Sequence, residues 1–225
     1  METQQETDLT ESMSRVLTSL AKATNTDEPS EPKWPALIDR VKLVMEQDGV
    51  DDALPHFERL FAKIATRELK SKDSPYPQGV MLCGVTGNGK TFRLKFMERH
   101  LSGMHMTTAV ELVEKIEKND SIDFFKDITR TDTGTLDMVP KRYYDLIIDD
   151  IGFEKTESVN YGNRRDIMER VILARYMVFP EHQTHFSTNL TEDQLKERYG
   201  DRIYSRLKEM CLFVTMKGED RRTAR

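Results

Sequence analysis

Long apolar runs are missing from this chain of 225 residues. None approaches the roughly 20 residues that a helix needs to cross a bilayer, and residues 1–6 lack the basic and apolar segments of a signal peptide. Cysteine is also scarce, because only Cys83 and Cys211 are present. Both lie in apolar, strand-like runs, so we expect buried free thiols and neither a disulfide nor a structural zinc site. These absences predict a cytoplasmic protein with no membrane partner.

An excess of positive charge is missing as well. The net charge is −5, with 34 basic and 39 acidic residues. Residues 1–79 carry 10 Lys and Arg against 15 Asp and Glu, whereas residues 80–225 carry 24 of each. Charge alone therefore gives no indication of nucleic-acid binding. A chain of this length that is 37% hydrophobic and 32% charged predicts one polar globular domain with an appendage.

The most informative motif is a phosphate-binding loop. An apolar run at 80–83 precedes it and a helix-permissive stretch at 92–99 follows, which is the strand–loop–helix context that this motif needs. Backbone N–H groups of the loop and the positive end of the helix dipole both favour an anion there. The loop fits the pattern G-x-x-x-x-G-K-[ST] and consists of Gly84, Val85, Thr86, Gly87, Asn88, Gly89, Lys90 and Thr91.

The loop predicts specific contacts with ATP and Mg²⁺. We expect Lys90 to reach the β- and γ-phosphates and the Thr91 hydroxyl to hold Mg²⁺, and we include the next residue, Phe92, among the nucleotide-binding residues. Without a phosphate, Lys90 is expected to be solvated. Arg93, Lys95 and Arg99 make the same helix basic, and we interpret them as its solvated face.

A second motif follows the apolar run at 146–148, which is typical of a parallel strand buried on both faces. Asp149 and Asp150 come directly after this run, at the strand end where open α/β sheets bind their ligands. Two aspartates after a strand usually mark a turn. In a chain that also contains a P-loop earlier in the sequence, they indicate a Walker B element. Asp149 would then hold Mg²⁺, and Asp150 would orient or deprotonate the attacking water. Glu154 is the alternative base.

Two regions are predicted along the chain. Residues 1–73 contain helical patterns and a Pro-rich linker, and we expect them to form a helical partner-binding region. Residues 74–225 alternate strands with helices, which predicts a parallel sheet. Helices are predicted at 8–22, 37–47, 53–70, 108–118 and 164–179, the linker near 24–35, and strands at 80–83, 104–107, 146–148, 184–188 and 212–216.

Later motifs narrow the class of protein. Asn189 follows the strand at 184–188, a segment at 197–207 contains Arg202 and Arg206, and a segment at 217–222 ends in Arg222. With the two earlier motifs, this order resembles the AAA+ ATPases of the bacterial helicase-loader group, the DnaC-like and IstB-like proteins, over about residues 78–222. The resemblance implies an α/β P-loop NTPase fold of AAA+ type, with a five-stranded parallel sheet flanked by helices. A helical N-terminal extension and no evident C-terminal lid domain are expected.

The resemblance also implies roles for single residues. Asn189 becomes the sensor 1 residue, and Arg206 becomes an arginine finger that acts on ATP bound by a neighbouring subunit. Arg202 is a second candidate for the finger, and Arg222 has a sensor-like role. Asp150 stands where AAA+ proteins usually have Glu, so hydrolysis is expected to be slow or stimulated by a partner.

The implied function is that of an ATP-dependent loader of a hexameric replicative helicase, acting in DNA replication. The loader would assemble into an ATP-dependent oligomer and contact single-stranded DNA. Two alternatives stay open: an IstB-like transposition helper that acts on target DNA, and an ATP switch that hydrolyses slowly. A small-molecule kinase is disfavoured by Asn189 and by residues 205–207. Phe124 and Phe125 are candidates for base stacking, although packing on the sheet is the better explanation for them.

Overall fold

The computed structural model describes residues 34–47, 57–70, 72, 74–101, 103–119, 145–155, 158–160 and 163–217. The predicted helix at 8–22, most of the predicted linker, Phe124, Phe125 and Arg222 lie outside these residues. None of the described helices is long and apolar enough to span a membrane.

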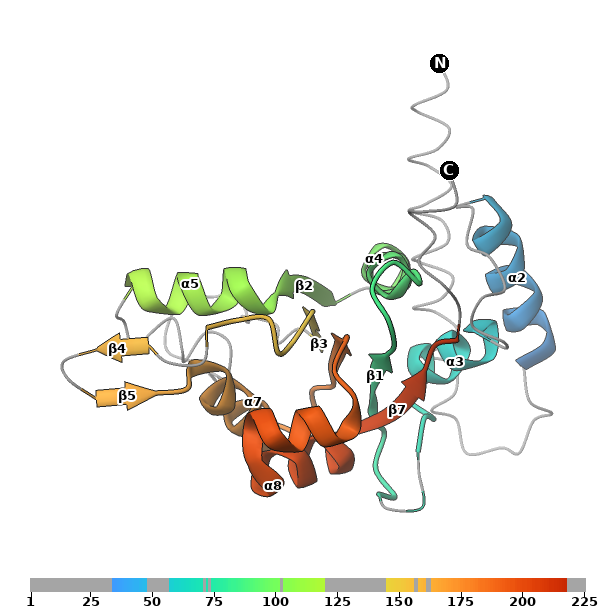
Figure 1. Cartoon of the computed structure of the whole chain (residues 1–225). Coiled ribbons are helices and arrows are strands. Elements are labelled where there is room, and N and C mark those ends of the chain that lie inside the picture. The colour runs from blue at the N-terminus through green and yellow to red at the C-terminus, as the bar shows by residue number, and fades with distance from the viewer. Residues whose placement is uncertain are drawn as a thin grey trace, which may run out of the picture.

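Five parallel strands form the central sheet, in the order β2-β3-β6-β1-β7 (Figure 1). Because all five run the same way, their carboxyl ends meet at one edge of the sheet. The predicted parallel sheet is confirmed, with each strand end within one residue of its predicted position. The strands are β1 Gly79–Cys83, β2 Met104–Thr108, β3 Asp145–Asp149, β6 Thr184–Thr188 and β7 Cys211–Thr215.

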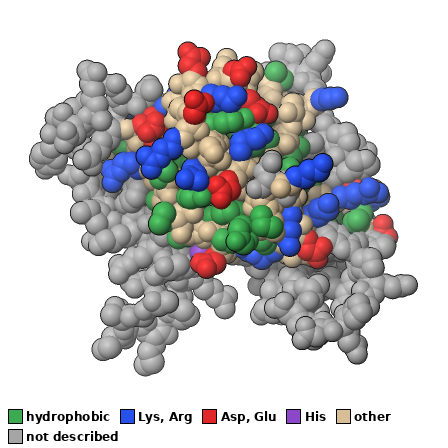
Figure 2. All heavy atoms as spheres, turned by 90° about the horizontal axis from the view of Figure 1, so that it is seen from below, with side chains coloured by type: hydrophobic (Ala, Val, Ile, Leu, Met, Phe, Trp, Pro, Cys, Tyr) green, Lys and Arg blue, Asp and Glu red, His purple; other side chains and the backbone are tan. Residues whose placement is uncertain are grey.

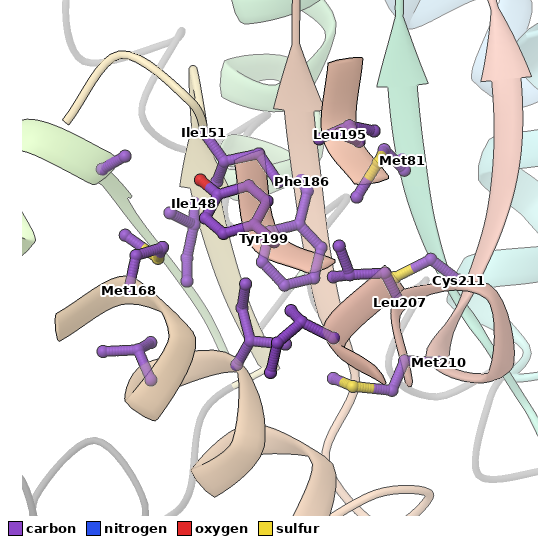
Figure 3. Close-up of a cluster of buried hydrophobic side chains, with 14 of the residues drawn as sticks. Met81, Ile148, Ile151, Met168, Phe186, Leu195, Tyr199, Leu207, Met210 and Cys211 are labelled. Atoms are coloured by element: carbon purple, nitrogen blue, oxygen red, sulfur yellow. The ribbon is translucent and has the colours of Figure 1, made fainter. Parts of the chain in front are cut away.

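Alternate residues of the strands enter two separate hydrophobic clusters. Val80 and Leu82 of β1 belong to one cluster, and Met81 and Cys83 belong to the other, since successive side chains of a strand point to opposite faces. The first cluster contains residues of α2 Trp34–Gln47, α3 Phe57–Ala65 and α4 Lys90–His100. The second contains residues of α5 Ala109–Asn119, α7 Ile167–Met177 and α8 Glu192–Met210. Figure 3 shows part of the second cluster, with Phe186 and Tyr199 near its centre.

The two cysteines confirm the expectation of free thiols. Both Cys83 and Cys211 are buried and unpaired in the structure. Burial raises the pKa of Cys83 to about 11 and also raises the pKa of Cys211, so both stay protonated at neutral pH.

Helix α3 is shorter than predicted. It ends at Ala65, whereas the apolar pattern predicted a helix through residue 70. Arg67 has a left-handed φ of 56°, which is incompatible with a continuing α-helix. Its guanidinium group donates to Asp145 Oδ2 at 3.1 Å and to Glu181 O at 2.7 Å, so the turn after α3 is attached to the amino-terminal edge of the sheet.

The predicted start of a helix at Arg164 is wrong. Residues Asn163–Arg165 form strand β5, which pairs antiparallel with β4 Ser158–Asn160 in a hairpin. Helix α7 begins only after Asp166, whose carboxylate caps it by accepting a hydrogen bond from Glu169 N at 3.2 Å. The hairpin projects from one end of the molecule, and α2 and α3 lie at the other (Figure 1).

Candidate functional site

A pocket of about 310 Å³ lies at the carboxyl edge of the sheet. Its lining comes from the loop after β1, the start of α4 and the residues that follow β3 and β6, so three motifs that are distant in sequence meet there. The lining residues are Thr86, Gly87, Gly89, Lys90, Thr91, Phe92, Lys95, Asp150 and Asn189.

The loop between β1 and α4 has a shape that requires glycine. Gly89 has a φ of 91°, and a Cβ there would lie 2.7 Å from Arg93 Nη1. A Cβ on Gly84, whose φ is 147°, would lie 2.4 Å from Asn88 Nδ2 and 2.7 Å from Met216 O. Asn88 in turn donates to Met216 O at 3.2 Å, so the loop is joined to the chain that follows β7.

Lys90 is buried, which corrects the expectation of a solvated lysine. Only 4% of it is exposed. Its ammonium group donates to Gly84 O and Val85 O, both at 2.8 Å, and to Asn189 Oδ1 at 2.5 Å. The curled loop turns carbonyl oxygens toward the first turn of α4, and these oxygens replace water around the cation.

The two aspartates at the carboxyl end of β3 are placed differently. Asp149 is 2% exposed, and its Oδ1 accepts a hydrogen bond from the Ser187 hydroxyl. Asp150 lines the pocket and has a left-handed φ of 57°, a strained conformation that is tolerated best by Asp, Asn and Gly. Asn189 Nδ2 lies 3.5 Å from Asp150 Oδ1, so Asn189 lies between Lys90 and Asp150.

Oxygen atoms of this edge suit a magnesium ion. Carboxylate and hydroxyl oxygens are the protein ligands that Mg²⁺ prefers, usually one or two of them together with phosphate and water. Asp149 and Thr91 provide such oxygens. No group of three or more Asp, Glu, His or Cys residues gathers for metal binding within the described part of the chain.

Glu154 is disfavoured as an alternative base. Its carboxylate accepts hydrogen bonds from Gly152 N at 2.7 Å, Arg198 Nη2 at 2.7 Å and the Tyr199 hydroxyl at 2.5 Å. Burial and the Glu154 carboxylate raise the pKa of Tyr199, so its hydroxyl remains a donor. Arg198 also pairs with Asp166. This network joins the loop after Asp150 to α8 and to the start of α7.

Arg206 and Arg202 lie outside the pocket of their own chain. Arg206 is 38% exposed in its side chain, stacks over the Tyr176 ring at 4.4 Å and donates to Tyr176 Oη at 2.9 Å and Glu209 Oε2 at 3.2 Å. Arg202 is exposed on the same helix. An arginine that acts on ATP bound by a neighbouring subunit has to lie outside the nucleotide pocket of its own subunit. The role of arginine finger stays a prediction for Arg206 and for Arg202.

Arg93 of α4 is buried, which corrects its interpretation as part of a solvated face. Arg93 is only 1% exposed, donates to Gly89 O at 3.2 Å and stacks 5.7 Å from the centre of the Phe57 ring. Burial lowers its pKa. Lys95 is exposed but lines the pocket. A helical spacing of four residues from Thr91 was the available signal for Lys95, because such residues share one face.

Ser187 was also missed from the sequence. It is fully buried on β6 and contacts both aspartates. Its position two residues before Asn189 was the available signal, because alternate residues of a strand share one face.

The strand order, the loop after β1 and the helices on both faces define a P-loop NTPase fold of the AAA+ type. Among solved structures, the crystal structure of the DnaC helicase loader shares this fold at 17% identity and a TM-score of 0.50, over 74% of this chain and 92% of that chain. The resemblance to the AAA+ helicase-loader group is thereby confirmed for the fold, which is all that such low identity shows.

Two further solved structures are similar at lower scores. The crystal structure of DnaI is 18% identical with a TM-score of 0.47, over 88% of each chain. AMPPCP-bound DnaA from Aquifex aeolicus is 17% identical with a TM-score of 0.46, over 74% of this chain and 48% of that chain. No family model and no curated protein matches the sequence.

Proposed function

We propose that this chain is an ATPase that binds ATP with Mg²⁺ and hydrolyses it. The observation that carries the proposal is the meeting in one pocket of Lys90, from the start of α4, with Asp150 and Asn189, which directly follow β3 and β6. The loop N–H groups and Lys90 would hold the β- and γ-phosphates, and Thr91 and Asp149 would hold Mg²⁺, which neutralises phosphate charge when bound. Asp150 and Asn189 would face the γ-phosphate and the attacking water.

The contacts of Lys90 support its part in this proposal. The loop and Asn189 atoms that it contacts at 2.5–2.8 Å are neutral oxygens. The Lys90 ammonium group attracts a phosphate oxygen, which carries a full negative charge, more strongly than a neutral carbonyl oxygen, which carries only a partial charge. A phosphate can therefore compete for the lysine with the loop carbonyls.

Substitution of Lys90 tests nucleotide binding. We expect Lys90→Met to weaken ATP binding by at least about 100-fold, which corresponds to about 2.7 kcal/mol, when affinity is measured with a fluorescent ATP analogue. Lys95→Met is the matched control, because it removes an exposed cation from the same pocket, and we expect only a small change. Unfolding midpoints are measured for both, since Lys90 is buried. A folded Lys90→Met protein with wild-type affinity would refute the proposal.

We further propose that ATP turnover serves the loading of a hexameric replicative helicase. The order of motifs and the fold shared with the DnaC helicase loader support this function. An IstB-like transposition helper would have the same ATPase core. The two functions are therefore distinguished by identifying the protein that binds this chain. Recovery of a hexameric helicase with the tagged full-length chain in the presence of ATP would support loading, whereas recovery of a transposase would support the alternative.

Oligomerisation would complete the site through Arg206 or Arg202. Arg206 would have to leave Tyr176 and Glu209, whereas Arg202 makes no hydrogen bond or ion pair with the described residues. An arginine finger contributes ~10³-fold or more in rate. Mixing Arg206→Ala with Lys90→Ala protein should restore some ATPase activity, because a mixed interface pairs an intact loop with an intact finger. If only Arg202→Ala protein complements Lys90→Ala, the finger is Arg202.

Binding of single-stranded DNA would be weak in one subunit. Figure 2 shows Lys and Arg beside acidic and apolar side chains on the face seen from below, and no excess of positive charge is available to hold phosphates. Some cations of the described chain stack on rings, such as Lys196 over Tyr204 at 4.9 Å and Lys208 over Phe213 at 4.7 Å. We expect affinity for labelled single-stranded DNA to rise with a non-hydrolysable ATP analogue and to fall steeply with salt.

The division at residues 73 and 74, with partner docking by the first part, remains a proposal. Helices α2 and α3 share a hydrophobic cluster with β1 and α4, so deleting residues 1–73 would expose core side chains. Paired substitutions of Leu17 and Leu20 by Asp in the full-length chain test docking better. We expect partner recovery to fall while ATP affinity is unchanged, and equal recovery would place docking on the ATPase core.

A further inference from the structure

Ser187 contacts three successive residues at the carboxyl end of β3, the last residue of the strand and the two that follow it. Its hydroxyl donates to Asp149 Oδ1 and accepts a hydrogen bond from Asp150 N at 2.9 Å. Its carbonyl oxygen accepts from Ile151 N at 2.9 Å. Ser187 is fully buried, so no water competes for these bonds. One side chain of β6 therefore connects both aspartates of the pocket edge.

The chemistry of a hydroxyl group determines what Ser187 does to Asp149. A serine hydroxyl has one proton to donate, and here that proton is directed to Asp149 Oδ1. The other carboxylate oxygen, Oδ2, receives no proton from Ser187 and stays available as a ligand for a cation. Ser187 thereby selects one oxygen of Asp149 for metal binding and restricts rotation of the carboxylate.

The same hydroxyl stabilises the backbone of Asp150. The φ of 57° at Asp150 is a strained conformation, which persists only where surrounding contacts hold it. The N–H groups of Asp150 and Ile151 both donate hydrogen bonds to Ser187. The backbone is therefore fixed at the strained residue Asp150 and at the residue that follows it. This backbone conformation directs the Asp150 side chain into the pocket.

We propose that Ser187 is a positioning residue for the Mg²⁺ and water side of the site, a role that rests on the proposed ATPase function. It acts through Asp149 and Asp150 and does not touch the nucleotide. The P-loop side does not depend on it, since Lys90 is held by the loop carbonyls and Asn189. Loss of the hydroxyl should therefore affect Mg²⁺-dependent binding and turnover but not metal-free nucleotide binding.

The test uses the full-length chain with Ser187→Ala, and binding of a fluorescent ATP analogue is titrated with Mg²⁺ and repeated in EDTA. Loss of a residue that orients a metal ligand typically costs 10–100-fold in metal affinity or activity. We expect the Mg²⁺ concentration at half-saturation to rise by about that factor, while the affinity in EDTA stays within about twofold of wild type.

Thr107→Val is the matched control. Thr107 has a buried hydroxyl on β2 that donates to Thr108 O at 3.4 Å and bonds to neither aspartate, so its removal should leave the Mg²⁺ dependence unchanged. If Ser187→Ala does not fold, Ser187→Cys replaces the hydroxyl by a weakly bonding thiol of similar shape, and we expect the same shift.

Three outcomes separate the two proposals. A folded Ser187 variant with the Mg²⁺ dependence of the wild type overturns the positioning role and leaves the ATPase proposal intact. Equal losses with Mg²⁺ and in EDTA also overturn it, because they indicate a general structural role. A wild-type chain whose nucleotide binding does not respond to Mg²⁺ overturns the metal assignment itself, and the role of Ser187 with it.

Discussion

The two sides of the pocket are held together by different contacts. On the P-loop side, the buried Lys90 is held by carbonyl oxygens only five and six residues away in sequence. On the carboxylate side, Asp149 and Glu154 are held by Ser187 and Tyr199, which are 38 and 45 residues away. A curled loop can supply acceptors to a cation from its own backbone, whereas buried carboxylates need donors from other elements. The comparison shows that Lys90 receives acceptors from its own loop as well as from the distant Asn189, whereas the side-chain donors to the two carboxylates come from residues far away in sequence.

Asp150→Asn should produce the largest effect and should separate the two sides by function. We expect ATP to remain bound, because the P-loop side is unchanged, while turnover falls by about 10²–10⁴-fold with the loss of the base. Single-turnover hydrolysis and equilibrium binding measure the two effects. Asp149→Asn is the comparison variant, since it should instead weaken Mg²⁺-dependent binding. Wild-type turnover by Asp150→Asn would show that the base lies elsewhere, and turnover too slow to detect in the wild type would favour the ATP switch.

Phe57→Ala should show how much the P-loop side depends on the N-terminal helices. Phe57 is fully buried and packs against Phe61, Phe96 and the guanidinium group of Arg93. Loss of the ring should lower the free energy of unfolding by about 3–5 kcal/mol, as measured by urea denaturation. Leu43→Ala, at a 55% exposed position of α2, should change it by less than about 0.5 kcal/mol. Similar losses in both variants would contradict the shared core.

Arg198→Met tests the ion pairs of the carboxylate side. Removing this cation leaves Glu154 and Asp166 without their charged partner, and we expect a loss of about 3 kcal/mol in the free energy of unfolding. In the double variant Arg198→Met, Glu154→Gln, the loss should be smaller than the sum of the two single losses. Additive losses would show that Arg198 and Glu154 do not interact. Lys196→Met removes a more exposed cation of the same helix as the control.

A buried histidine of β6, which is bonded to β1, predicts a smaller, pH-dependent effect. Burial, together with the charges of Arg67 and Arg175, lowers the pKa of His185 from 6.5 to about 3, and its Nδ1 accepts from Val80 N at 3.2 Å. Below pH 6.5 the unfolded chain binds a proton that the folded chain does not. Stability should therefore be complete above about pH 7.5 and should be about 2 kcal/mol lower at about pH 5.

His185→Asn keeps a hydrogen-bond acceptor without a titrating ring, so it should flatten this pH dependence. The measurement is the free energy of unfolding in urea between pH 5 and pH 8. An unchanged slope in His185→Asn would assign the effect to another group, with His182 next, because burial also lowers its pKa.

Motifs and periodic patterns predicted much of the fold. The five strands and the pocket residues Lys90, Thr91, Asp150 and Asn189 follow from contiguous motifs, whose geometry depends on neighbours in sequence. The hairpin of β4 and β5 was missed, because Asn163–Arg165 is polar and has no alternating pattern. Arg93 was misplaced because arginine is usually exposed, and only packing against α3 shows that this one is buried.

The sequence by itself determined the parallel sheet, the phosphate loop and the identity of the residues at the strand ends, because these depend on local backbone geometry and on alternation. The tertiary structure alone decided which oxygen of Asp149 is bonded, how Asp150 is held and that Glu154 is paired with Arg198 and Tyr199. Those contacts join residues about 40 positions apart. No local pattern specifies them, since hydrogen bonds between side chains form only when the packed strands and helices bring donor and acceptor within about 3 Å.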